Sequence, residues 1–176
     1  MKNVVGLLMS ALSFPALAAL NVGDPAPDFS TQASLGGKEF TYSLSEALKA
    51  GPVVLYFYPA AFTKGCTVEA HDFAEAMPEF KALGASVVGV SNDSIETLNK
   101  FSVSECQSKF PVASDRSQRI MKSYDAVLLW KTSYANRVSY VISTDGKVAY
   151  SYTSLDPGRH VANTLAAVRK LRDRMP

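Results

Sequence analysis

Two cysteines, Cys66 and Cys106, carry the most reactive side chains of this sequence, and the setting of Cys66 could activate it. Cys66 stands in FYPAAFTKGCTVEAHDF, where an apolar run ends at Pro59 and a helical pattern begins at about Cys66. The thiolate is the attacking form, yet only about 3% of an ordinary cysteine is ionised at pH 7. The unpaired N–H groups and positive dipole end of a helix N-terminus would stabilise that thiolate. The sequence therefore predicts a nucleophilic cysteine here.

The residues just before Cys66 fit the same chemistry. Thr63 lies one helical turn earlier, which would bring its hydroxyl near the sulfur. Pro59 fixes the backbone and removes a donor where the apolar run ends. Lys64 could add positive charge or point to solvent. A free cysteine is, however, most often a small apolar residue of a protein core, so position alone leaves both interpretations open.

The elements that must position Cys66 are two apolar runs with a helical pattern between them. The runs VVLYFY (53–58) and SVVGVS (86–91) predict strands buried on both faces of a parallel sheet. We expect Pro78 to break the helix that begins at about Cys66, and a second helix to end at Gly84. Strand, helix and strand together predict a βαβ unit.

The other segments complete an alternating pattern. Helices are expected in SLSEALKAG, SNDSIETLNKF, SQRIMKSY and HVANTLAAVRKL, with Cys106 in the last turn of the second of these or just beyond it. FPVASD predicts a short extended piece, and Gly36-Gly37 a hairpin-like turn. RVSYVISTDGKVAYSY predicts two strands around an Asp145-Gly146 turn. The fold class is therefore α/β, with a mixed central sheet flanked by helices and one domain over residues 19–176.

Composition narrows the class of protein. With 176 residues, 47% of them hydrophobic, the chain can bury a full core, and 19% charged residues argue against disorder. A net charge of +2 without a stripe of basic residues does not indicate binding to nucleic acid.

Residues 1–18, MKNVVGLLMSALSFPALA, read as a signal peptide with small residues before the cleavage site. The alternative is a membrane anchor, but the apolar run is shorter than the ~20 residues that a span needs. We expect an exported protein without stable membrane association, in a bacterial periplasm. Export permits a disulfide between Cys66 and Cys106. A domain of this size hardly needs one for stability, which favours a redox role.

The spacing Pro59-x-x-x-Thr63-x-x-Cys66 resembles the active-site motif of the peroxiredoxin family. Further segments that are similar to the family extend from Val22 to about Val148. The sequence FYP…GCTVEA resembles the bacterioferritin-comigratory, or Q-type, branch. The resemblance implies a thioredoxin-like fold and reduction of hydrogen peroxide and organic hydroperoxides, with no cofactor or metal. It also implies recycling by a thioredoxin-like or low-molecular-weight thiol reductant, in a monomer or homodimer.

The resemblance assigns roles to individual residues. Cys66 matches the peroxidatic cysteine, which becomes a sulfenic acid, and Thr63 matches the hydroxyl that orients the peroxide. Pro59 matches the residue that shields the pocket. Arg137 matches the family arginine that holds the thiolate and a peroxide oxygen, and Glu69 could orient that arginine.

The sequence departs from the Q-type pattern at two positions. Many members carry a resolving cysteine five residues after the first, where this chain has His71, and Lys64 replaces a common proline. Cys106 is then the remaining thiol that could resolve Cys66, and the alternative is a buried inert Cys106 with an external thiol recycling Cys66. His71 could donate a proton, although a partly exposed helix residue is the more common case.

His160 reads as a surface residue at a helix start, and two distant histidines make no metal site. Trp130 could form an apolar collar with Phe62 or pack in the core. A thioredoxin-like disulfide oxidoreductase would need two cysteines separated by two residues, and Cys66 is followed by Thr67, Val68 and Glu69. A non-catalytic binding module would not need the proline, threonine, cysteine and arginine set.

Overall fold

The computed structural model of the chain describes residues 19–174, and the predicted signal peptide lies outside them. The strands are β1 (Ser30–Leu35), β2 (Lys38–Ser43), β3 (Val53–Phe57), β4 (Ser86–Ser91), β5 (Val112–Ser114), β6 (Val138–Ile142) and β7 (Val148–Thr153). The helices are α1 (Leu44–Ala50), α2 (Lys64–Ala82), α3 (Ile95–Ser104), α4 (Arg119–Ser123), the short 3₁₀ helix η1 (Pro157–Arg159) and α5 (His160–Arg172).

One mixed sheet of seven strands, in the order β2-β1-β5-β4-β3-β6-β7, organises the described chain. The central strand β3 runs parallel to β4 and antiparallel to β6, and β4 runs parallel to β5. The two predicted hairpins are present, with β1 paired to β2 around Gly36-Gly37 and β6 paired to β7 around Asp145-Gly146. The predicted α/β class with a mixed sheet is confirmed.

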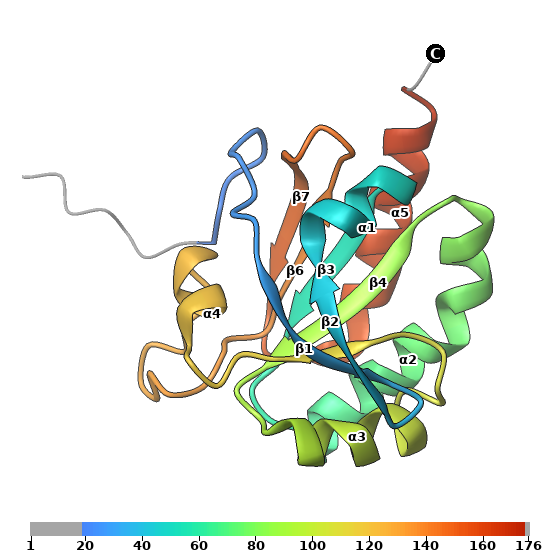
Figure 1. The fold of residues 1–176 in the computed structure, drawn as a ribbon. Coiled ribbons are helices and arrows are strands. Elements are labelled where there is room, and N and C mark those ends of the chain that lie inside the picture. Colours follow the sequence, from blue (N-terminus) through green and yellow to red (C-terminus); the bar gives the residue numbers. More distant parts are fainter. Residues whose placement is uncertain (1–18, 175–176) are drawn as a thin grey trace, which may run out of the picture.

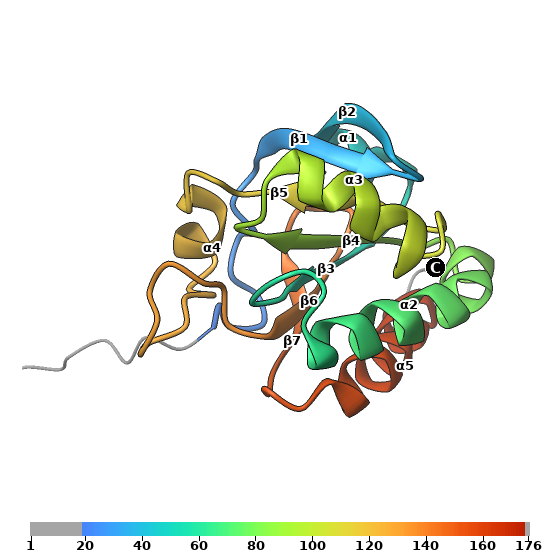
Figure 2. The same ribbon diagram turned by 90° about the horizontal axis from the view of Figure 1, so that it is seen from below.

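Helices cover both faces of the sheet because the central strand is apolar on both sides. Val54 and Tyr56 of β3 face a core that includes side chains of α2, α3 and α5. Val53, Leu55 and Phe57 face the opposite core, to which α1 and α4 contribute. Figures 1 and 2 both show α2 and α5 side by side, with α4 at a distance from them. Alternation along β3 thus fixes which helices meet on each face.

Helix α2 runs unbroken from Lys64 to Ala82, so the predicted break at Pro78 is wrong. Pro78 itself is exposed, and the helix buries Ala74 and Met77 before it and Phe80 after it in one core. Burial of this continuous apolar face outweighs the single backbone hydrogen bond that a proline removes. Gly84, at φ +74°, follows the helix as the predicted capping glycine.

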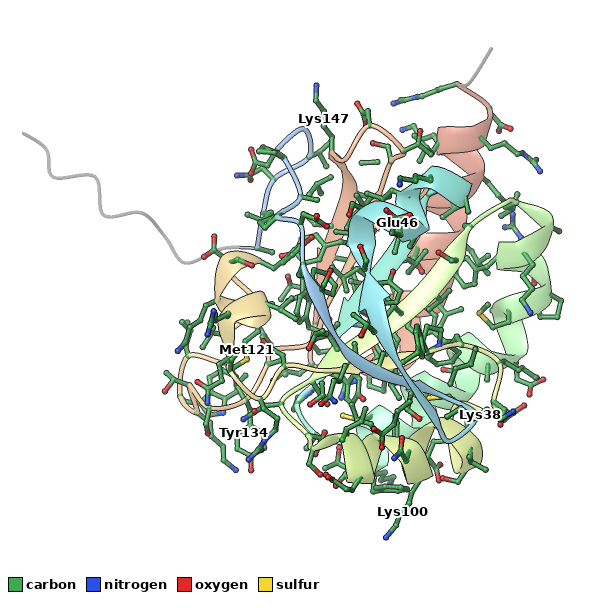
Figure 3. The ribbon with its side chains drawn as sticks, in the orientation of Figure 1. Lys38, Glu46, Lys100, Met121, Tyr134 and Lys147 are labelled. Carbon is green, nitrogen blue, oxygen red and sulfur yellow. The ribbon has the colours of Figure 1, made fainter. Side chains whose placement is uncertain are left out.

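Charged side chains are spread over the surface rather than gathered. Figure 3 shows Lys147 and Lys100 at opposite ends of the fold, with Glu46 on α1 and Lys38 at the start of β2 between them, and all four are exposed. Met121, a residue of α4, is by contrast buried in the core. Within residues 19–174, no helix has the length and apolar character that crossing a membrane requires.

Candidate active site

Cys66 is the third residue of α2, in the first turn after the loop that leaves the central strand β3. The helix begins at Lys64, two residues earlier than the sequence indicates, and Cys66 is buried. The first i→i−4 bond of α2 is made by the amide of Thr67 to the carbonyl of Thr63, at 2.9 Å. The amides of residues 64–66 therefore take no part in the i→i−4 hydrogen bonds of the helix, and they can donate hydrogen bonds to an anion at the sulfur.

The loop before α2 is held in one conformation by the end of β4. The amide of Ala61 donates to Oδ2 of Asp93 at 2.7 Å, and the hydroxyl of Ser91 donates to the same oxygen at 2.7 Å. Phe62 adopts φ +63°, a left-handed conformation that is uncommon for a bulky residue. The Thr63 hydroxyl donates to the carbonyl of Ala60 at 2.9 Å. These contacts fix the point at which α2 begins.

Arg137 lies immediately before β6, which pairs with β3, so the sheet brings it to the start of α2. Its Nη2 lies 3.4 Å from Sγ of Cys66, and its Nε donates to the carbonyl of Leu155 at 3.0 Å. Its Nη1 donates to Oε2 of Glu69, one turn along α2 from Cys66. The guanidinium is thus held at three corners, with its charge directed at the sulfur.

Gly65 allows this close approach. A Cβ atom at position 65 would lie 3.0 Å from Nη2 of Arg137, so a larger residue would displace the guanidinium. Lys64 is exposed, as expected for a side chain that points to solvent.

Glu69 is fully buried beside Arg137, where the sequence suggests that it could orient the arginine. Burial raises the pKa of Glu69 to about 8, although the charge and hydrogen bond of Arg137 partly offset that effect. An ordinary carboxyl group of this kind would be ionised at pH 7, so this environment is unusual.

His160 is buried, and the prediction of a surface residue is wrong. Its Nδ1 lies 2.7 Å from the hydroxyl of Ser139 and 3.6 Å from Oε1 of Glu69. Burial lowers the pKa of His160 to about 4. The signal that could have placed it is helical spacing, because His160, Thr164 and Val168 share one face of α5 and all three are buried.

Cys106 lies two residues beyond the end of α3, as predicted, and is fully buried. It belongs to the same apolar core as Cys66, together with Tyr56 and Tyr58. Burial raises the pKa of the Cys106 thiol well above its ordinary value. Both cysteines are free thiols in the structure. Of the two, Cys66 is the one that lies at a helix start in contact with a guanidinium group.

The segment after Cys106 is strained and is tied to α2 by side chains. Gln107 and Ser108 both adopt left-handed conformations, at φ +51° and +55°. Nε2 of His71 lies 3.0 Å from a carboxylate oxygen of Glu105, and the side chain of Gln107 donates to Glu75 at 3.0 Å. His71 is exposed on α2, so it links the helix of Cys66 to the segment of Cys106.

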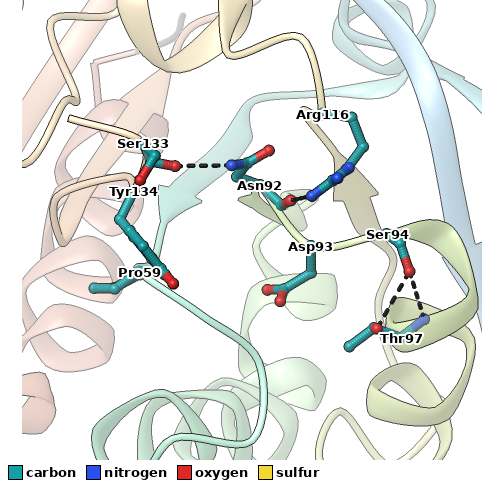
Figure 4. A pocket seen from close by; sticks show the side chains of 8 residues that line it. All are labelled: Pro59, Asn92, Asp93, Ser94, Thr97, Arg116, Ser133 and Tyr134. Carbon is teal, nitrogen blue, oxygen red and sulfur yellow. Dashed lines mark hydrogen bonds between the residues drawn. The ribbon is translucent and has the colours of Figure 1, made fainter. Parts of the chain in front are cut away.

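A polar pocket of about 330 Å³ opens beside the loop that precedes α2 (Figure 4). Pro59 forms part of its wall, and Asn92 donates to the carbonyl of Ser133 at 2.8 Å across it. Trp130 is 72% exposed, so its predicted alternative of core packing is wrong. Phe62 is 49% exposed and packs edge-on against Phe101, and its collar with Trp130 stays a prediction. Among residues 19–174, no group of His, Cys, Asp and Glu side chains is arranged to hold a metal ion.

Comparison with known proteins decides which family this site belongs to. Residues 22–151 match the AhpC/TSA family. The chain is a member of the peroxiredoxin family. Peroxiredoxin Bcp of Xanthomonas campestris is 31% identical over 151 residues, which cover 82% of this chain and 92% of that protein. The chloroplastic peroxiredoxin Q of Populus jackii is 33% identical over 163 residues, covering 92% of this chain and 74% of that protein.

Solved peroxiredoxin structures share the fold as well. The crystal structure of peroxidoxin BcpB from Mycobacterium tuberculosis superposes with a TM-score of 0.77 at 34% identity, covering 85% of this chain and 97% of that one. The expected thioredoxin-like fold and the resemblance to the Q-type branch are confirmed. Within this peroxiredoxin, Cys66 occupies the helix start and Arg137 contacts it.

Proposed function

We propose that this peroxiredoxin is a thiol-dependent peroxidase in which the Cys66 thiolate attacks hydrogen peroxide and organic hydroperoxides. The observation that carries the proposal is the contact of 3.4 Å between Nη2 of Arg137 and Sγ of Cys66 at the first turn of α2. A buried cation beside a buried thiol favours the ionised form of the sulfur. The helix N-terminus acts in the same direction.

The proposed reaction transfers one oxygen atom to the sulfur. Sγ of Cys66 attacks the terminal oxygen of the peroxide, the O–O bond breaks, and the leaving oxygen takes a proton to become water or an alcohol. The sulfur is oxidised to a sulfenic acid and the peroxide is reduced. Donors that are in place before the reaction favour the charge that develops on the leaving oxygen.

We assign the donors to Arg137 and the amides of Gly65 and Cys66, and we assign the hydroxyl of Thr63 to orienting the peroxide. Because the Thr63 hydroxyl gives its hydrogen to the carbonyl of Ala60, its oxygen is available to accept a hydrogen bond from the peroxide O–H. Pro59 borders both the loop and the neighbouring pocket, where it would limit the access of water.

Resolution of the sulfenic acid by Cys106 is the second part of the proposal. The Cys106 thiol attacks the Cys66 sulfur, releases water and forms a disulfide that a thioredoxin-like or low-molecular-weight thiol then reduces. A disulfide requires Cα atoms within ~7 Å. We expect the segment around Cys106 to open so that Cys106 can reach this distance from Cys66. The left-handed strain at Gln107 and Ser108 would be relieved by that opening, which supports this route.

We further propose that the enzyme acts after export to the periplasm. The apolar run and small residues of positions 1–18 support this location. Fractionation of a producing bacterium, with mass measurement of the N-terminus, tests it. A mature chain that begins at residue 19 in the periplasmic fraction is expected, and an intact N-terminus in the cytosol would refute it.

Peroxide consumption with dithiothreitol as the reductant tests the enzymatic proposal. We compare the wild-type protein with Cys66→Ser and Cys106→Ser. Cys66→Ser should lose turnover completely while its circular dichroism spectrum stays native. Cys106→Ser should keep turnover, because dithiothreitol can reduce the sulfenic acid directly. Sustained turnover in Cys66→Ser would overturn the proposal.

A further inference from the structure

A chain of buried contacts leads from Cys66 through Arg137 and Glu69 to His160. Oε2 of Glu69 accepts a hydrogen bond from Arg137. The other carboxyl oxygen, Oε1, has no hydrogen-bond partner among the described residues and lies 3.6 Å from Nδ1 of His160. Both side chains are fully buried. An ionised oxygen without a donor is expensive to bury, so this arrangement calls for an explanation.

The tautomer of His160 can be deduced from its neighbours. Nε2 lies 2.9 Å from the carbonyl oxygen of Ser154, which can only accept, so Nε2 carries a hydrogen. In a neutral imidazole Nδ1 is then an acceptor, and the Ser139 hydroxyl at 2.7 Å donates to it. If Glu69 were ionised as well, two acceptor atoms would face each other across 3.6 Å with no proton between them.

One added proton removes this conflict, on either partner. A proton on Oε1 makes Glu69 neutral, and a proton on Nδ1 makes His160 a cation that offsets the carboxylate. The Ser139 hydroxyl suits both states, because it can donate to Nδ1 or accept from it. In both states the pair has zero net charge. The buried group then sums to zero when Cys66 is a thiolate and Arg137 a cation, whereas without that proton it would carry a net negative charge.

We propose that Glu69 and His160 hold one proton between them, and that this proton leaves the charge of Arg137 to the Cys66 thiolate. His160 is on this account a positioning residue that acts through Glu69. The inference rests on the proposed peroxidase function, since the thiolate is the group that gains from it.

The charged and titratable groups around the pair are consistent with this assignment. Glu69 is faced by Asp72 on α2, by Tyr56 on β3, by Arg137 before β6 and by His160 on α5. His160 is faced by Arg137, Asp156, Tyr152 and Glu69. Burial raises the pKa of Glu69 to about 8 and lowers the pKa of His160 to about 4, which favours the carboxyl group as the holder at pH 7.

Nuclear magnetic resonance of the reduced wild-type protein tests the proposal without any turnover. Carboxyl-¹³C glutamate and ¹⁵N histidine labels report the protonation of Oε1 and Nδ1. Glu69→Gln identifies the carboxyl-carbon signal of Glu69. The chain has two histidines, so His71→Ala leaves only the signals of His160. We expect one proton on the pair at pH 7, lost as the pH rises through about 8. An ionised Glu69 together with a neutral His160 at pH 7 would overturn the proposal.

A second readout uses the pH dependence of Cys66 alkylation by iodoacetamide. Glu69→Gln removes a carboxyl group whose charge the shared proton already cancels, so the profile should move by less than about half a pH unit. Removal of a full negative charge beside the sulfur would instead move the profile to lower pH by about one unit or more, and that result would contradict the proposal. Glu79→Gln, an exposed carboxylate on the same helix, is the matched control.

The two proposals fail in different ways. If the pair holds its proton but the protein consumes no peroxide, the peroxidase function and the stated benefit to the thiolate are wrong. If peroxide is consumed while Glu69 is ionised and His160 neutral, the peroxidase function stands and the shared proton is wrong.

Discussion

Arg137 connects three parts of the chain through a single guanidinium group. It reaches the sulfur of Cys66, the carboxyl group of Glu69 and the carbonyl of Leu155. From the sequence alone it is one of several arginines, and only the family resemblance singles it out. The contact with Leu155 was not predictable, because backbone carbonyls carry no sequence signal. The burial of His160 could have been predicted from helical spacing, because His160 shares one face of α5 with Thr164 and Val168. The Pro-Thr-Cys motif is visible directly in the sequence.

Substitution of Arg137 tests the role of its charge and of its planar geometry. Arg137→Ala should lower the rate of Cys66 oxidation by hydrogen peroxide by about 10²–10³-fold, the usual effect of removing one transition-state donor. Arg137→Lys keeps the charge but loses the fork, so an intermediate rate is expected. Stopped-flow fluorescence measures the rate, and Arg119→Ala, at an exposed position on α4, is the control. An unchanged rate in Arg137→Ala would show that this arginine does not act on the sulfur.

At the scale of elements, the start of α2 is where the sheet and the helix combine into a site. The end of β4 fixes the loop through Asp93, and β6 delivers Arg137 because it pairs with β3. Apolar runs and the hairpin signal made these strands predictable. The unbroken α2 was not, because the local effect of Pro78 is outweighed by tertiary packing that the sequence does not display.

Gly65→Ala separates the geometry of this helix start from its stability. Alanine is the better helix former by about 1 kcal/mol, so the free energy of unfolding should not fall. The new Cβ would lie 3.0 Å from Nη2 of Arg137 and displace the guanidinium. We expect peroxide oxidation of Cys66 to slow by roughly tenfold, as small misplacements of catalytic groups do. Lys64→Ala, in the same turn, should leave the rate unchanged. Equal rates in Gly65→Ala and the wild type would mean that the close approach has no function.

At the scale of the whole molecule, the buried Glu69–His160 pair should make stability depend on pH. The raised pKa of Glu69 favours the folded state at low pH, and this advantage is lost between about pH 4.5 and 8. The lowered pKa of His160 acts oppositely between about pH 4 and 6.5, so the two effects offset each other there. Above about pH 6.5 the folded state holds the extra proton, and its stability falls as the pH rises.

Urea unfolding across this range measures the effect. The wild type should lose on the order of 2 kcal/mol between about pH 6.5 and 8. Glu69→Gln keeps only the histidine effect, so its stability should rise up to about pH 6.5 and then level off. The difference between the two curves isolates the pair from other titrating groups. Parallel curves would refute a proton bound by the pair.

The central claim is that this protein reduces peroxide at the sulfur of Cys66. Peptide mass mapping after a single equivalent of hydrogen peroxide, without reductant, tests it most directly. We predict a Cys66–Cys106 disulfide within one chain in the wild type, and a sulfenic acid at Cys66, trapped by dimedone, in Cys106→Ser. A wild-type Cys66 sulfenic acid with Cys106 still free would leave the peroxidase intact but remove the resolving role of Cys106. Peroxide oxidation elsewhere in the chain, with Cys66 unmodified, would contradict the account.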